Sequence, residues 1–468
     1  MLLKPARREY HLRAAGWLVA RAGERVDEFS ATIANHFELA GNLVRAGSWY
    51  ARAAHLARSA YNLQAATEYY HKALNFLSNL SGPLERYTLY EGLGGVLRLQ
   101  ARLDEAEQVL QKMSALAEEL GDWTRQANAQ NALWGVLSPQ ARYEEALEVS
   151  RRAIALARRA ENPDLAIQAQ AIFQVGILEY RLDDLDEAER CGLESLALSQ
   201  RAGAKAQIAS SDNLLAIIYT LRGLYQRAIV YFQDGLELWR EIRHREHEAA
   251  LLSNLGECYR MLGDARLALD HYQQADRIAS DIGDNLNRVS FLNNMCAAYN
   301  LLGDYPLALR SIQGALEDIS ADSFNAAEVH YDAAETYLGL GDFALAARHA
   351  REAVRLAAGF IVPEMIGHAW RVAGRVASAS GGSIRLDWQA GEADFLADNC
   401  FEKAVETFAA ARMERHQGVA LWEWARHAAL VGDHQRSNQL YDSARVFFVK
   451  CELDLLLETM EKERLAWF

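Results

Sequence analysis

The chain has 468 residues, of which 51% are hydrophobic and 24% charged, and its formal net charge is −14. Nucleic acids are bound mainly through basic faces, so this charge argues against a nucleic-acid partner. The longest apolar run, Leu214 to Leu221, is too short to cross a bilayer, and the first residues lack the apolar segment of a signal peptide. The five cysteines form no Cys-x-x-Cys pair. We therefore expect a cytoplasmic protein with reduced thiols and no membrane partner.

One residue pattern recurs along the chain. It begins with a turn residue, has a bulky residue two positions later, usually an alanine five positions in, and a small residue twelve positions in. Between residues 101 and 341 the pattern restarts every 38 to 42 residues, which indicates a tandem repeat. The pattern starts at residues 41, 61, 101, 141, 183, 223, 263, 303, 341, 399 and 432.

The residue types within the repeat predict pairs of helices. Gly263–Asp264 has the sequence of a helix stop followed by a helix start, since glycine accepts the left-handed cap and aspartate caps the next amides. A second helical pattern precedes each such turn, with a small residue followed by an aromatic residue three positions later, as at Gly256 and Tyr259. Residues three apart share a helix face, so the small residue admits a neighbouring helix and the aromatic residue packs beside it.

These patterns resemble the tetratricopeptide repeat (TPR) family over roughly residues 29 to 450. The unit of about 40 residues is longer than the usual 34 or so and is similar to the long-helix subset found in kinesin light chain and bacterial Rap receptors. The N-terminal string RREYHLRAAGWL, Arg7 to Leu18, resembles the junction where such repeats follow the ATPase module of MalT-like regulators. No phosphate-binding loop of the type G-x-x-x-x-G-K-[ST] is present in the sequence.

The resemblance implies an all-α fold, a right-handed superhelical TPR α-solenoid of about eleven helix-turn-helix repeats. We expect an N-terminal helical segment over residues 1–28 and a TPR solenoid over 29–360. Residues 361–468 are expected to hold further repeats, an insertion near 381–399 and a capping helix. A stack of this kind lets a long chain bury its apolar residues repeat by repeat.

The resemblance also places a ligand groove on the concave face, lined by the first helix of each pair. Asn131, Asn213 and Asn293 occupy the same place in three repeats, where related proteins use asparagine to hold a peptide backbone through both a donor and an acceptor. The alternative is that these residues are only solvated polar positions. The full set of predicted groove residues is Asn131, Tyr180, Asn213, Arg260, Asn293, Asn300, Tyr331, Arg371, Arg375 and Trp388.

No catalytic residue, metal site or cofactor is predicted. His244 and His247, with Glu248 nearby, have a spacing that suits a metal site, but a charged turn in solvent is the favoured interpretation. Trp422 and Trp424 cannot share one helix face, so one of them is expected to be exposed.

The insertion contains Ile384, Leu386 and Trp388 alternating with polar residues, which is typical of an extended segment with one apolar side. The simpler interpretation is a structural patch, and the other is a gate that adds Trp388 to the groove next to Arg371 and Arg375. The following helix is expected to begin near Gly391.

The sequence therefore predicts a non-catalytic scaffold or regulatory module that binds a protein or peptide in its groove. The alternative is a small-ligand sensor domain of a signalling or transcription-regulating ATPase, with that ATPase as its partner. A scaffold without a groove ligand is a third possibility, and an enzyme is a distant fourth.

Overall fold

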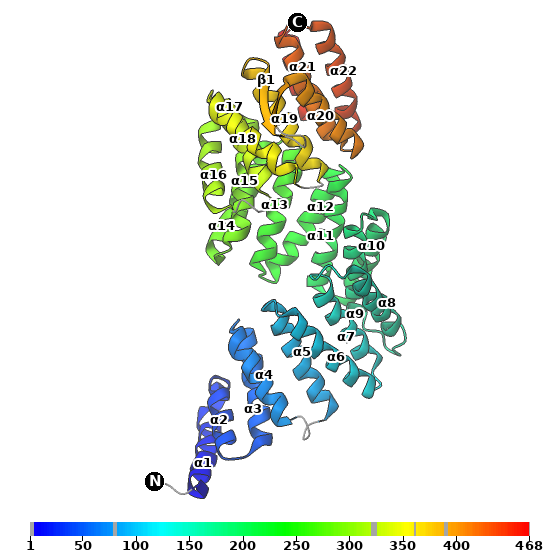
Figure 1. The fold of residues 1–468 in the computed structure, drawn as a ribbon. Helices are drawn as coiled ribbons and strands as arrows, with labels where there is room; N and C mark the ends of the chain where they lie inside the picture. Colours follow the sequence, from blue (N-terminus) through cyan, green and yellow to red (C-terminus); the bar gives the residue numbers. More distant parts are fainter. Residues whose placement is uncertain (1–3, 78–81, 320–324, 360–361, 388–391, 468) are drawn as a thin grey trace. The chain divides into compact units, whose positions relative to one another are not determined.

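The structure is a computed structural model that describes residues 4–77, 82–319, 325–359, 362–387 and 392–467. Almost all of these residues form helices joined by short turns (Figure 1). The chain divides into two compact units, residues 1–214 and 215–468, and the division falls inside one helix. The boundaries expected near residues 28 and 360 remain predictions about domain organisation.

The first unit holds a row of antiparallel helix pairs. Neighbouring helices in the sequence pack against each other, and α5, α7 and α9, the first helices of successive pairs, also contact one another. Its elements are α1 (Lys4–Ala22), the 3-10 helix η1 (Gly23–Phe29), α2 (Ser30–Leu39), α3 (Leu43–Ser59), α4 (Leu63–Leu77), α5 (Pro83–Leu99), α6 (Leu103–Glu119), α7 (Trp123–Leu137), α8 (Tyr143–Ala157), α9 (Leu165–Arg181), α10 (Leu185–Ala202) and most of α11 (Lys205–Leu221).

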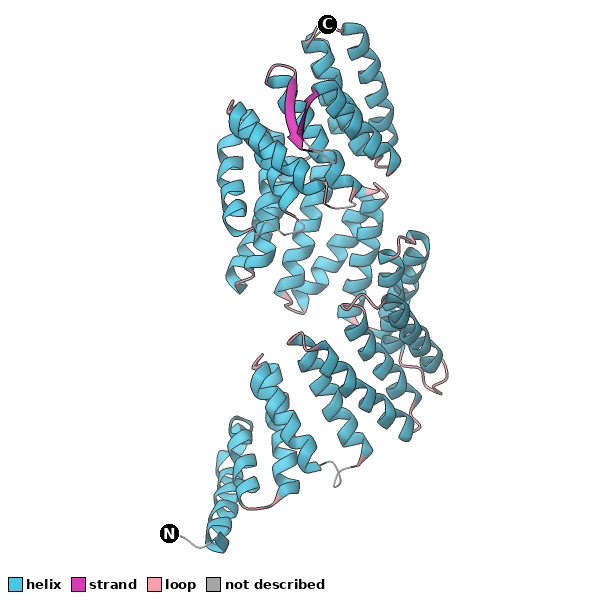
Figure 2. Ribbon diagram, viewed as in Figure 1, coloured by secondary structure: helices cyan, strands magenta, loops and turns pink. Residues whose placement is uncertain are grey.

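The second unit continues the same pairing and adds one antiparallel hairpin, which holds the strands of the described chain (Figure 2). Its elements are α12 (Tyr225–Glu241), α13 (Arg245–Leu262), α14 (Ala265–Ile282), α15 (Asn285–Leu302), α16 (Tyr305–Asp318), α17 (Ala326–Gly339), α18 (Phe343–Ala357), α19 (Pro363–Ala379), β1 (Ser383–Asp387), β2 (Glu392–Leu396), α20 (Ala397–Ala410), α21 (Glu414–Leu430), α22 (His434–Lys450) and α23 (Asp454–Trp467).

The repeat turns have the geometry that the glycine–aspartate pattern predicts. Gly263 takes a φ of 93°, and the Asp264 side chain accepts a hydrogen bond from the Leu267 amide at 3.1 Å. Where the pattern lacks glycine, another residue adopts the left-handed conformation, as Ala101 and Ala141 do with φ of 56° and 57°. The turn is therefore set by the helix-pair geometry, and glycine only lowers its conformational cost.

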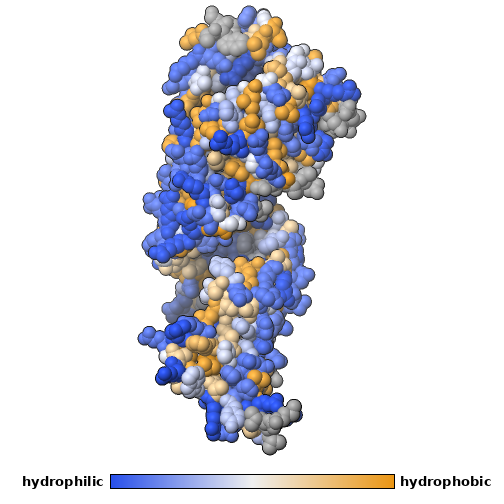
Figure 3. All heavy atoms as spheres, turned by 90° about the vertical axis from the view of Figure 1, so that its left-hand side faces the viewer, coloured by the Kyte–Doolittle hydropathy of each residue, from blue (hydrophilic) through white to orange (hydrophobic). Residues whose placement is uncertain are grey.

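The small residues predicted at the helix crossings are confirmed as close-approach positions. A Cβ atom added to Gly256 would lie 2.6 Å from Cε1 of Tyr272, whose side chain is fully buried. Cys296, at the equivalent position of α15, is also fully buried. On the face shown in Figure 3, hydrophilic side chains surround scattered apolar ones, as expected when the apolar stripe of each helix is used between helices.

Two glycines of α5 should respond in opposite ways to alanine. Gly95 has open space around its missing side chain, so Gly95→Ala should raise the free energy of unfolding by up to about 1 kcal/mol through helix propensity. A Cβ on Gly92 would lie 2.5 Å from Cζ of the buried Tyr70, and overpacking of about 1–3 kcal/mol should outweigh that gain. Urea unfolding of the two variants measures the difference, and equal shifts would contradict the close packing of α5 on α4.

The insertion differs from its predicted form in one respect. Residues 383–387 and 392–396 pair as a hairpin, and α20 begins at Ala397 instead of near Gly391, because Glu392 to Leu396 are held in the antiparallel ladder. Ile384 and Leu386 are buried, which confirms that the apolar side packs. The hairpin rests on α18, α19 and α20, where the Phe395 ring lies 5.1 Å from that of Trp370. Trp388 lies outside the described residues.

Candidate functional site

The second unit has an inner face formed by the first helices of its pairs. Helices α13, α15, α17, α19 and α21 contact each other in succession. The row also returns to its beginning, because the Arg415 guanidinium of α21 donates to the Met261 carbonyl oxygen of α13 at 2.9 Å. Leu455 and Leu456 of α23 approach Gly263 at the end of α13. We call the inward side chains of these five helices the inner face. They are Glu257, Arg260, Glu328, Tyr331, Asp332, Glu335, Glu364, His368, Arg371, Arg375, Arg415, His416 and Glu423.

Two arginines and two glutamates form one network on the inner face. Arg371 of α19 contacts Glu335 of α17 at 2.5 Å and Glu423 of α21 at 2.7 Å. Arg375, one turn further along α19, contacts the same two carboxylates at 3.0 and 3.6 Å. Burial pushes the pKa of Glu335 upward, but the two arginines overcome that effect and hold the pKa below its ordinary value. The network ties three successive first helices together.

A second ionic cluster lies at the α13 side of the inner face. Arg260 contacts Glu257 at 2.5 and 2.8 Å, and the Tyr272 hydroxyl donates to the same carboxylate at 2.9 Å. Burial and the neighbouring Glu257 together raise the pKa of the Tyr272 hydroxyl well above its ordinary value. Arg260 also interacts electrostatically with Asp332 of α17, so the cluster faces the carboxylates of that helix.

Three further carboxyl groups of the inner face, those of Glu328, Asp332 and Glu364, have raised pKa values, and burial is the largest cause for each. Burial is the largest cause for Glu328, and repulsion from Glu364 and Glu257 adds to it, so the pKa of Glu328 rises to about 7. Burial likewise raises the pKa of Asp332 well above its ordinary value, and Glu335 adds to the effect. The inner face therefore changes its charge in the physiological pH range.

Glu364, His368 and His416 place three possible metal-ligand atoms within 4.8 Å of one another. Burial lowers the pKa of His416 well below its ordinary value, and Arg415, Arg260 and Arg371 lower it further. The same three guanidinium groups oppose a divalent cation at this point, and the Arg371 Nε already donates to Nδ1 of His368 at 3.3 Å. We interpret these residues as a neutral histidine cluster of the inner face and derive no metal chemistry from them.

The structure places the predicted groove residues in several different settings. Asn131 and Asn300 brace neighbouring first helices, because Asn131 donates to the Ile167 carbonyl of α9 at 3.0 Å and Asn300 donates to the Asp332 carbonyl of α17 at 3.1 Å. The side chains of Asn213 and Asn293 have no hydrogen-bond partner among the described residues. Arg260, Arg371, Arg375 and Tyr331 belong to the inner face of the second unit, and Tyr180 is a half-buried residue of α9 in the first.

The three equivalent asparagines share one property. The Oδ1 atoms of Asn131, Asn213 and Asn293 are all buried and accept no hydrogen bond from the described residues. A buried amide oxygen without a donor carries a cost of about 1–3 kcal/mol, and a donor from a bound molecule removes it. The sequence located these positions, but it missed Glu328, His368, His416 and Glu423, because their proximity depends on the closure of the helix row.

The other histidine pair is not arranged as a metal site. The Nδ1 atoms of His244 and His247 lie 2.9 Å apart, and the His247 ring packs at 4.2 Å from that of Trp239. Glu248 is buried and is engaged by Arg240 and Arg245 at 3.0 and 3.1 Å. His247 is exposed and His244 is half-buried, so the pair lies at the surface of the helix pair, as expected for a turn in solvent.

Comparisons with known proteins agree with this architecture. A family model described as tetratricopeptide repeat matches residues 125–201 and 207–281. The apo form of the quorum sensor NprR from B. thuringiensis superposes with a TM-score of 0.52 at 14% identity, over 75% of this chain and 98% of NprR. This likeness shows the helical-repeat fold.

Two other solved structures are similar at lower scores. The apo form of RapI has a TM-score of 0.47 at 14% identity, over 58% of this chain and 97% of RapI. BtubC from P. vanneervenii has a TM-score of 0.42 at 19% identity, over 47% and 90%. No curated protein matches the sequence. In the described part of the chain, no helix combines the length and the apolar character that a bilayer span requires.

Proposed function

Because this chain is a tetratricopeptide-repeat protein, we propose that it is a non-catalytic regulatory module that binds a protein or peptide along its first helices. Repeat proteins of this kind present an extended surface made of equivalent positions from successive repeats. The narrower resemblance to the repeat region of MalT-like regulators stays a prediction.

The observation that carries the proposal is the set of asparagine Oδ1 atoms. Asn131, Asn213 and Asn293 come from α7, α11 and α15, at the same place in each repeat, and each presents a buried acceptor that no described residue satisfies. An extended peptide offers backbone N–H donors to such acceptors, which the first unit presents at Asn131 and Asn213 and the second unit at Asn293. Structural asparagines would instead have both amide atoms engaged.

The inner face of the second unit adds charge selectivity to backbone recognition by Asn293, which belongs to the same unit. Arg371 and Arg375 are held by Glu335 and Glu423, so their positions are set before any partner binds. Glu328 and Glu364 add carboxyl groups whose pKa values are raised by burial. A partner segment with basic or hydrogen-bonding side chains suits this surface better than an acidic one.

The test uses peptides selected from a random 12-residue display library on the full-length chain. Fluorescence polarisation then compares the wild type with Asn213→Ala, Asn293→Ala and the double variant. Each loss of a hydrogen bond to a peptide backbone should cost about 1 kcal/mol, which is about a fivefold increase in Kd, and the double variant should lose at least that much for a peptide bound to either unit. Thermal unfolding should change little, because neither side chain loses a described partner.

Asn399→Ala is the matched control, since Asn399 is an exposed asparagine on the second helix α20. Asn131→Ala should differ from the two single variants by also lowering stability, because it removes the donor to the Ile167 carbonyl as well as a proposed peptide acceptor. Unchanged affinity in the double variant would place the peptide elsewhere. Unfolding of the double variant would assign these asparagines a structural role.

The alternative function is a small-ligand sensor for an ATPase or signalling partner. It is favoured by one observation, a basic pocket beside α18 that is separate from the inner face.

A further inference from the structure

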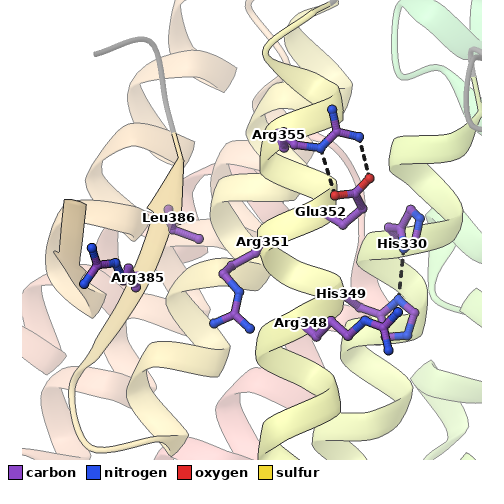
Figure 4. Close-up of a pocket in the computed structure, with 8 residues that line it drawn as sticks. All are labelled: His330, Arg348, His349, Arg351, Glu352, Arg355, Arg385 and Leu386. Atoms are coloured by element: carbon purple, nitrogen blue, oxygen red, sulfur yellow. Dashed lines mark hydrogen bonds and ion pairs between the residues drawn. The ribbon is translucent and has the colours of Figure 1, made fainter. Parts of the chain in front are cut away.

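A pocket of about 620 Å³ lies between α17, α18 and β1 (Figure 4). Pockets that hold small molecules usually measure about 300–1,000 Å³, so this one has room for more than a single inorganic ion. Leu386 of the hairpin is fully buried and forms an apolar wall opposite α18. The lining residues are His330, Arg348, His349, Arg351, Glu352, Arg355, Arg385 and Leu386.

The basic residues of the pocket follow one face of α18. Arg348, Arg351 and Arg355 are spaced three and four residues apart, which puts their side chains on the same side of the helix. Arg355 contacts Glu352, the one carboxylate of the lining, at 2.5 and 2.9 Å. The side chains of Arg348 and Arg351 make no hydrogen bond or ion pair with any residue that the structure describes. The Arg385 side chain extends to the other side of β1 in Figure 4, so we leave it out of the ligand contacts.

Two histidines complete the floor of the pocket. The Nδ1 atoms of His330 and His349 lie 2.9 Å apart, so one ring donates and the other accepts. Burial lowers the pKa of His349 to about 4, with His330 and Arg348 as further causes, and burial also lowers the pKa of His330. The pair is therefore neutral near pH 7. The ring that accepts at Nδ1 carries its proton on Nε2, which can donate to a ligand.

A positive pocket is unusual on a chain whose net charge is −14. Like charges repel, so two arginines one turn apart without acidic partners are destabilising unless an anion joins them. Guanidinium groups bind phosphate oxygens through two parallel hydrogen bonds, and two such groups on one helix face suit adjacent phosphates. The neutral imidazole donor and the apolar Leu386 wall suit the organic part of such a molecule.

We propose that this pocket binds a small molecule that carries two or more phosphate groups, with Arg348 and Arg351 as the principal phosphate contacts. The site is distinct from the inner face and does not depend on peptide binding there. Recognition requires only the free anion, so no covalent step accompanies it.

Isothermal titration of the full-length chain with ADP and with inorganic pyrophosphate tests the proposal. The site variant is Arg348→Gln with Arg351→Gln. The control is Arg266→Gln with Arg310→Gln, which removes the same charge from exposed arginines of α14 and α16, outside the pocket. We expect one saturable site in the wild type and the control, competition between the two ligands, and at least a tenfold increase in Kd in the site variant. If the double site variant does not fold, Arg351→Gln alone should still raise Kd severalfold.

Several results would overturn the proposal. One is the lack of saturable binding of either ligand by the wild type. Equal losses in the site variant and the control would show that only net charge matters. If ADP binds but pyrophosphate does not compete with it, the pocket does not recognise the phosphate groups. If a polyglutamate peptide binds and neither ligand does, the pocket is a site for an acidic protein segment.

Discussion

Arg371→Met should lower the free energy of unfolding by about 3–5 kcal/mol. The change leaves the buried carboxylates of Glu335 and Glu423 with only Arg375, and breaking a buried ion pair from one side costs about this much. The side chains of Arg371, Glu335 and Glu423 are only 10%, 12% and 8% exposed, so water cannot replace the lost partner. Urea unfolding of the full-length chain, followed by circular dichroism, measures the effect.

The matched control for this prediction is Arg310→Met, because Arg310 is exposed on α16 and surface substitutions usually change stability by no more than about 0.5 kcal/mol. Adding Glu423→Gln to the Arg371→Met variant should recover part of the loss, since it removes one of the unpaired charges. A loss below about 1 kcal/mol in Arg371→Met would show that solvent reaches the network.

Glu328→Gln should stabilise the protein at pH 8 by up to about 3 kcal/mol and have little effect at pH 4. The pKa of Glu328 is about 7 in the folded chain, against an ordinary value of 4.5, because of burial and the neighbouring Glu364 and Glu257. A pKa difference of one between the folded and unfolded chain corresponds to about 1.4 kcal/mol of stability. The stability contributed by protonated Glu328 is therefore fully present below pH 4.5 and is lost as the pH rises through 7. Above that pH the free energy of unfolding no longer changes because of this group.

The measurement is the difference in the melting temperature between the wild type and Glu328→Gln from pH 4 to 9. The histidines of the inner face titrate in the opposite sense, but they are common to both proteins and their effect largely cancels in the difference. Glu144→Gln is a suitable control, since Glu144 is an exposed residue in the first turn of α8. A difference that does not vary with pH would contradict the burial of Glu328.

The candidate sites could be predicted from the sequence only in part. Equivalent positions in a repeat are visible as a period, so Asn213, Asn293 and Arg371 could be assigned to the first helices without coordinates. The spacing of Arg348, Arg351 and Arg355 was visible in the same way, but its meaning depends on the hairpin that forms the opposite wall. The sequence period shows which helix of a pair carries a residue, but it does not show which side chains of distant helices are close together.

The prediction for the tryptophan pair also failed because it used local spacing alone. Trp422 and Trp424 do lie on different faces of α21, yet both are buried, so the expected exposure of one was wrong. The Trp422 Nε1 donates to Glu463 of α23 at 2.8 Å, and the Trp424 Nε1 donates to Asp398 of α20 at 2.5 Å. A helix with neighbours on both sides buries two faces, and those neighbours are 26 and 41 residues away in the chain.

The sequence by itself determined the helices, their pairing and their turns, because these depend on local spacing: glycine and aspartate at the turns, small residues at the crossings and an apolar stripe on each helix. Only the tertiary structure decided that α21 and α23 return to α13 and that the hairpin packs on α18 and α19. The burial of charge on the inner face follows from that return. Such long-range contacts are formed by the summed curvature of many repeats, which no local pattern encodes.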